Sequence, residues 1–230
     1  IKNSINSLLN KISLNNYDKL EVQILEILRE NKVKKNKTDD NEEDILNSVI
    51  ENIFLKSTVQ PVYCPLYVKL ILNIIKQLNL KTQINKILSE KCNLFQNIID
   101  IQIEQKEASN ISYDEFCEKI KSKNKKLGFA QFIGELYNNE MIKYTIIRKS
   151  ILLFMSNLNY CFENNLQDTK SDFIEDNIIC ICNLFNTCHS KIDNKKFINK
   201  TLNDLKNVKL IPKRLKFKIM DTCDDLKISC

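Results

Sequence analysis

Apolar residues recur every three or four positions along almost the whole chain, and only two glycines and three prolines interrupt them in 230 residues. This spacing puts the apolar side chains on one face of an α-helix. A fold built from many β-hairpins would need more glycine and other turn residues than this composition supplies. The sequence therefore predicts an all-α protein.

The most strongly patterned segment is residues 126–141, KLGFAQFIGELYNNEM. Its apolar side chains fill roughly half of a helical circumference, which is more than a surface helix needs. Both glycines of the chain, Gly128 and Gly134, lie here, although glycine costs about 1 kcal/mol in a helix interior. We therefore expect them to serve close packing or a hinge. The opposite, polar arc of the helix includes Gln131, Glu135 and Asn138.

About ten amphipathic segments follow one another, joined mostly by short links that pair them two by two. Each pair takes about 40 residues, which is the size of a helical hairpin in HEAT-type solenoids. The expected fold is an α-α superhelix, a HEAT/ARM-type solenoid of about five antiparallel helical hairpins. We expect residues 1–230 to form one such domain, monomeric and cut from a larger protein.

Several expectations concern single residues or links. Ser13 is predicted to cap the second helix, and residues 32–44 are predicted to form a charged loop. Leu152 and Phe217 are predicted to face the core. The nine cysteines, an odd number, are expected to be buried free thiols in a reducing compartment, with Cys92, Cys161, Cys180 and Cys223 on apolar stripes.

Catalytic and metal-binding chemistry finds little support in the sequence. The one histidine, His189, lies beside Cys188 and near Cys180 and Cys182, but no C-x-x-C pair accompanies them and adjacent helical residues do not face one another. Two glycines are too few for a phosphate-binding loop. We expect a non-enzymatic protein without metal or cofactor. No apolar run reaches the roughly 18 residues of a membrane span, so we expect no membrane association.

A family resemblance rests on motifs that follow one another along the chain. The pair Lys126-Leu127-Gly128 and Phe132-Ile133-Gly134-Glu135-Leu136 resembles the "SLG…FIGEL" signature in the middle domain of eukaryotic translation initiation factor 4 gamma. Residues 9–20, 49–67, 86–95, 182–185 and 213–221 are similar to further motifs of that domain, in the same order. The sequence departs from the pattern at residues 186–190, where NTCHS replaces "TTIGK".

The resemblance implies a scaffold role. Domains of this family bind a DEAD-box RNA helicase across both of its lobes and also bind RNA. A rigid, curved surface would reduce the orientational freedom that two mobile lobes lose on closing. The implied role is a cytoplasmic scaffold of translation initiation, with other initiation or mRNA-processing factors as further partners. The alternative is an adaptor in mRNA decay, export or splicing, which would place the protein in the nucleus.

The candidate binding residues fall into two sets. Gln131, Glu135 and Asn138 are predicted to face the helicase, although Glu135 could equally hold the preceding loop in place. RNA contact is predicted for two basic clusters, since each neutralised phosphate adds salt-sensitive affinity. The alternative reading is that these side chains are simply solvated. The clusters are Lys121, Lys123, Lys125 and Lys126, and Lys213, Arg214, Lys216 and Lys218.

Overall fold

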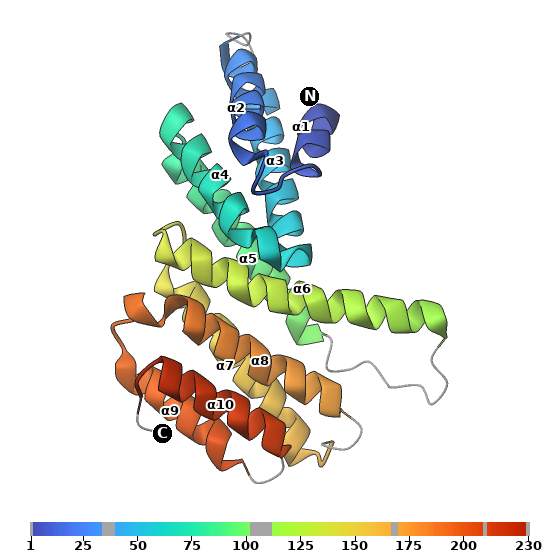
Figure 1. Cartoon of the computed structure of the whole chain (residues 1–230), viewed down its shortest axis with the longest axis vertical. Helices are drawn as coiled ribbons and strands as arrows, with labels where there is room; N and C mark the ends of the chain where they lie inside the picture. Colours follow the sequence, from blue (N-terminus) through green and yellow to red (C-terminus); the bar gives the residue numbers. More distant parts are fainter. Residues whose placement is uncertain (1, 34–39, 102–111, 167–169, 209–210, 229–230) are drawn as a thin grey trace.

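The computed structural model describes residues 2–33, 40–101, 112–166, 170–208 and 211–228. These residues form ten α-helices and two short 3-10 helices, and no strand occurs among them (Figure 1). The all-α prediction is confirmed. The elements are α1 (Lys2–Leu9), α2 (Tyr17–Val33), α3 (Asp40–Val59), η1 (Pro61–Tyr63), α4 (Cys64–Leu78), α5 (Lys81–Ile101), α6 (Tyr113–Asn138), α7 (Tyr144–Glu163), α8 (Ser171–Cys188), η3 (His189–Lys191), α9 (Lys195–Asn207) and α10 (Lys213–Asp225).

The helices stack in two layers. One layer runs through α2, α4, α6, α8 and α10, each in contact with the next, and the other runs through α1, α3, α5 and α7. Consecutive helices of the chain alternate between the layers, as in a solenoid of helical hairpins. Figure 1 shows α1–α4 in the upper half, α7–α10 in the lower half, and α6 crossing between them.

Local capping signals set where several helices begin. Ser112 and Glu115 form a capping box at the start of α6: the Glu115 amide donates to Ser112 Oγ at 3.2 Å, and the Ser112 amide donates to Glu115 Oε2 at 2.7 Å. Asn194 caps α9 by accepting a hydrogen bond from the Phe197 amide. These contacts satisfy amide groups that the first turn of a helix leaves without partners.

Aromatic rings gather in the core where α3, α5 and α6 meet. Phe95 of α5 stacks on Phe129 of α6 with ring centroids 4.3 Å apart, and Phe54 of α3 meets the edge of Phe132 at 5.4 Å. Phe129 and Phe132 are fully buried. These rings fix α6 against the N-terminal half of the solenoid, because aromatic pairs add about 0.5–1.5 kcal/mol beyond their burial.

The structure corrects two predictions about links. The residue that precedes α2 is Asn16, whose side-chain oxygen accepts from the Ser13 amide at 2.8 Å, so Ser13 is not the cap. Of the charged loop predicted over residues 32–44, residues 32–33 belong to α2 and residues 40–44 to α3, and residues 34–39 lie outside the described residues.

Predictions for three single residues also differ from the structure. Leu152 and Phe217 are exposed, because α7 and α10 each turn a second apolar edge to solvent. Cys223 is disulfide-bonded and not a free thiol. Other cysteines agree with the prediction: Cys92, Cys161 and Cys180 are buried and free.

No single helix in the described part of the chain is long and apolar enough to cross a membrane. Residues 45–59 of α3 and 61–78 of η1 and α4 reach that hydropathy only when taken together, and a bend of 119° separates them.

Candidate binding surfaces on α6, α10 and the end of α3

Helix α6 is held in place by close contacts on both sides. A Cβ atom at Gly128 would lie 2.0 Å from the carbonyl oxygen of Thr58 in α3, and one at Gly134 would lie 2.8 Å from the side chain of Thr187 in α8. Each glycine therefore lets a neighbouring helix approach more closely than any side chain would allow. The predicted packing role of the two glycines is what the structure shows, and it fixes where the polar arc of α6 lies.

All three residues predicted to face the helicase are half-buried, and two of them lie at the seams between α6 and its neighbours. The amide of Asn138 donates to the Thr187 carbonyl at 2.7 Å, so this side chain anchors the end of α8. Glu135 lies near Cys64 of α4, and burial raises the pKa of its carboxyl group. Gln131 shares the same arc and is also half-buried.

The first basic cluster does not form one surface. Lys126 is only 7% exposed, its Nζ lies 4.6 Å from the centre of the Phe173 ring, and burial lowers the pKa of its ammonium group. Lys126 is therefore withdrawn from the predicted RNA-binding set, because its charge lies inside the protein. Lys123 forms an ion pair with the buried Asp176 at 3.0 Å. Lys121 pairs with Glu118, and Lys125 is exposed.

The second basic cluster lies on α10 and surrounds an exposed aromatic residue. Phe217, predicted to be buried, is 61% exposed, and Met220 one turn further along the helix is also exposed. Lys213 is exposed, whereas Arg214 forms an ion pair with Glu175 of α8. Lys216 and Lys218 are half-buried. We call Phe217 and Met220 the α10 patch.

Three further apolar side chains are exposed where α3 ends and η1 begins, and the sequence did not predict them. Leu55 and Val59 are one turn apart on the outer side of α3, and Val62 in η1 is 85% exposed. We call these three residues the α3 patch. The available signal was that Leu55 and Val59 fall out of phase with the buried stripe of Val49, Ile50, Ile53 and Phe54. Isolated apolar residues on a surface are common, but a run of three at one helix end marks a candidate contact surface.

No group of three or more metal-ligating side chains occurs among the described residues. The Cys188 thiol is buried and donates to the Leu184 carbonyl at 3.0 Å, and burial raises the pKa of Cys188 to about 12. A thiol in this state is a poor nucleophile, because the thiolate is the reactive form. The geometry thus gives no support to a reactive Cys188–His189 pair.

Comparison with known proteins gives a family match over nearly the full length. A family model described as the MIF4G domain matches residues 2–227. The chain is 24% identical over 241 residues to a eukaryotic translation initiation factor 4G from Triticum aestivum, an alignment that covers 96% of this chain and 14% of the relative. It is 25% identical over 216 residues to the eukaryotic initiation factor 4F subunit p130 of Saccharomyces cerevisiae, covering 86% of the chain and 22% of the relative.

A relative from Arabidopsis thaliana, also a eukaryotic translation initiation factor 4G, is 24% identical over 207 residues, which cover 84% of the chain. The chain spans 10% of that protein's length, and less than a quarter of each of the other two. The similarity therefore concerns one part of much longer proteins.

Proposed function

The chain belongs to the MIF4G domain family, and from that premise we propose that it is a non-enzymatic scaffold of translation initiation that binds a DEAD-box RNA helicase and RNA. The observation that carries the proposal is the family match over residues 2–227 together with relatives that are translation initiation factors. Because those relatives are several times longer, we propose that residues 1–230 act as one domain within a larger protein in the cytoplasm.

Two exposed apolar surfaces support a scaffold role. The α3 patch lies in the N-terminal half of the solenoid, and the α10 patch lies on its last helix. A continuous series of packed helices joins the two patches. A partner with two lobes could contact one patch with each lobe, and a fixed spacing would reduce the orientational freedom lost when the lobes close. Gln131, Glu135 and Asn138 of α6 remain proposed helicase contacts between them.

Binding to the initiation helicase of the source organism tests this proposal. We expect the purified chain to bind that helicase at micromolar concentration and to stimulate its ATPase activity. Phe217→Ser should weaken binding without lowering the melting temperature, because this ring is exposed. Leu94→Ser is the matched control, since Leu94 is exposed on α5, outside both patches. Absence of both binding and stimulation would contradict the helicase role and favour the adaptor in mRNA decay, export or splicing.

For RNA, we propose contact through the exposed lysines of α10 and of the first part of α6. Lys213→Gln together with Lys125→Gln should lower affinity for single-stranded RNA and reduce its salt dependence, because fewer phosphates are neutralised. Lys126→Met is the matched control, because Lys126 is buried and should leave RNA affinity unchanged. If Lys126→Met lowered RNA affinity as much as the double change does, then burial would not distinguish lysines that bind RNA from lysines that stabilise the fold. Fluorescence anisotropy at several salt concentrations measures both quantities.

A further inference from the structure

The first half of α6 carries a stripe of apolar side chains that are exposed in the described structure. Tyr113, Phe116 and Ile120 recur at intervals of three and four residues, so they share one face of the helix, and all three are exposed. Phe129, which is buried in the core, follows Ile120 by nine residues and so lies on the opposite side. In Figure 1 this end of α6 projects sideways beyond its neighbours.

Lysines border this α6 stripe. Lys119 and Lys123 lie along one edge of it and Lys121 lies along the other, by their positions on the helix. Lys123 pairs with Asp176 and Lys121 with Glu118, whereas Lys119 is exposed to solvent. An apolar stripe with basic edges is suited to an apolar groove with an acidic edge.

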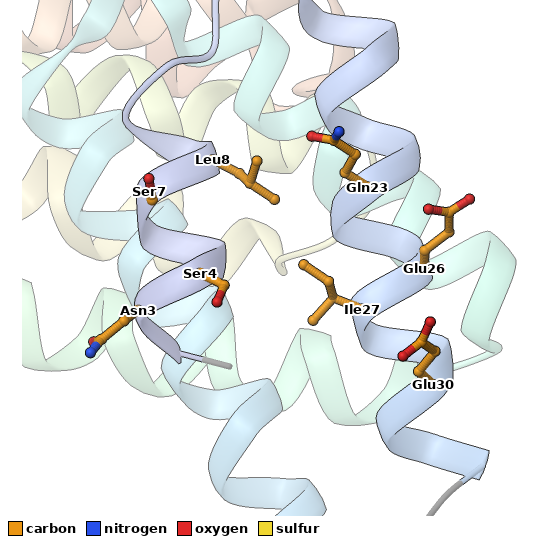
Figure 2. Close-up of a pocket in the computed structure, with 8 residues that line it drawn as sticks. All are labelled: Asn3, Ser4, Ser7, Leu8, Gln23, Glu26, Ile27 and Glu30. Atoms are coloured by element: carbon orange, nitrogen blue, oxygen red, sulfur yellow. The ribbon is translucent and has the colours of Figure 1, made fainter.

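The α1–α2 hairpin has a groove of that kind. An open cavity of about 650 Å³ lies between α1 and α2, and Leu8 and Ile27 point into it from opposite sides (Figure 2). Glu26 and Glu30 line the α2 side, and hydroxyl groups line the α1 side. Among the described residues that line this groove there is no lysine or arginine. It therefore has an apolar floor with the carboxylate of Glu26 at its edge, and it runs between two helices.

We propose that the α6 stripe of one molecule docks into the α1–α2 groove of a second copy of this chain. The apolar side chains Tyr113, Phe116 and Ile120 would cover Leu8 and Ile27, and Lys119 would face Glu26. The two surfaces lie on different parts of the molecule, so the contact is head-to-tail and links copies into a chain or a ring. This inference goes beyond the proposed helicase and RNA binding.

The α6 stripe does not reach the α1–α2 groove of its own molecule. Helix α6 packs on α3, α4, α7 and α8. Its first turns project from the side of the solenoid, whereas the α1–α2 hairpin lies at the upper end of the solenoid (Figure 1). Because α6 is one continuous helix, its first turns cannot fold back onto α1 and α2. The α6 stripe can therefore reach such a groove only on another molecule.

The contact is expected to be weak. Three exposed side chains and one open groove form an interface at the low end of known sizes, below about 1,200 Å² in total. The favourable contact energy must first offset the entropy that two molecules lose on association, and only the remainder appears as affinity. We therefore expect a dissociation constant of about 0.1–1 mM. At lower concentrations the chain should be monomeric, in keeping with the expectation from the sequence.

Sedimentation velocity over a concentration series tests the proposal with the full chain. We expect the mean sedimentation coefficient to rise with concentration, and added salt to reduce that rise because charges contribute. Changing Tyr113 and Phe116 together to Ser should weaken association about tenfold. Tyr160→Ser is the matched control, since Tyr160 is exposed on α7, away from both surfaces, and should have no effect. An unchanged coefficient up to about 1 mM for the wild type overturns the proposal.

A charge exchange identifies the two surfaces. Lys119→Glu alone and Glu26→Lys alone should each weaken self-association, and a mixture of the two variants should associate about as well as the wild type. Failure of the mixture to associate overturns the pairing of these surfaces. The proposal is likewise overturned if the Tyr113 and Phe116 change lowers RNA affinity but leaves association unchanged, because the stripe would then bind RNA. Helicase binding by the same variants is expected to stay normal, so the two proposals can fail separately.

Discussion

At the scale of single residues, burial decides which charges can reach a partner. Lys126 and Asp176 lie in the interior between α6 and α8. Burial lowers the pKa of Lys126 and raises the pKa of Asp176, so it favours the neutral form of each group. Lys123, 3.0 Å from Asp176, supplies the opposite charge that a buried carboxylate needs. Three of the ionisable groups on this side of the molecule are therefore structural, and Lys125 is the exposed lysine nearest to them in sequence.

Glu135 should make stability depend on pH. Its pKa is raised by burial, so the fold favours the protonated carboxyl group. The stabilising contribution of that form is complete below the unfolded pKa of about 4.3 and is lost as the pH rises through the folded value. We expect Glu135→Gln to raise the melting temperature at pH 7 and to have little effect near pH 4. Thermal unfolding followed by circular dichroism at the two pH values measures this.

A variant of Glu135 that melts earlier than the wild type at pH 7 would show that the carboxylate makes a stabilising contact in its ionised form. Glu175→Gln gives a useful comparison at a paired carboxylate, because this residue binds Arg214 and should lose stability instead. If Glu135→Gln also weakens helicase binding, then the Glu135 carboxylate lowers stability but contributes to recognition of the helicase.

Phe132 and Phe217 should contribute differently to stability, because the first is buried and the second is exposed. Phe132→Ala should lower the free energy of unfolding by about 3–5 kcal/mol, because it empties a fully buried site against Phe54. Phe217→Ala should change it by less than about 0.5 kcal/mol, because Phe217 is exposed. Urea unfolding measures both values. Equal losses would mean that the orientation of one of these helices is wrong.

At the scale of elements, α6 joins the two halves of the solenoid. It packs on α3 and α4 on one side and on α8 on the other, and one glycine serves each contact. The glycine contacts differ in kind, since Gly128 meets backbone atoms of Thr58 whereas Gly134 meets a side chain. Backbone in a packed helix yields less than a threonine side chain does.

Substitution of the two glycines should therefore have unequal effects. Gly128→Ala should destabilise the protein by at least about 1–3 kcal/mol, because the added methyl group would overlap the Thr58 carbonyl. Gly134→Ala should cost less, since the Thr187 side chain can shift and alanine favours the helix by about 1 kcal/mol. Chemical unfolding of both variants gives the comparison. A greater loss at Gly134 would contradict the packing described for α3 and α6.

At the scale of the whole molecule, the two proposed contact surfaces lie on one continuous stack of helices. If each helicase lobe contacts one patch, binding of the second lobe is intramolecular and gains from a high effective concentration. We expect Val62→Ser and Phe217→Ser each to weaken helicase binding while leaving it measurable, and the combined change to abolish it at micromolar concentration. Isothermal titration calorimetry with the intact helicase and with each isolated lobe measures this. Loss of all binding on changing one patch would contradict two-site attachment.

The sequence by itself determined the class of fold, the number and order of the helices, and the family. Apolar spacing is a local property, so buried residues such as Phe129, Phe132 and Ile133 could be recognised without a structure. The packing role of the two glycines followed from the cost that glycine imposes on a helix. The motif at residues 126–136, with further motifs in the same order along the chain, predicted the family that the comparison over residues 2–227 shows.

Tertiary structure alone decided which side chains are accessible. A helix with apolar residues on more than one face does not reveal which face its neighbours cover, so Phe217 was assigned to the core although it lies on the surface, and Lys126 to the surface although it is buried. The α3 patch, the α6 stripe and the groove between α1 and α2 depend in the same way on where distant helices end. Burial is a property of the whole packing arrangement, and local periodicity does not contain that information.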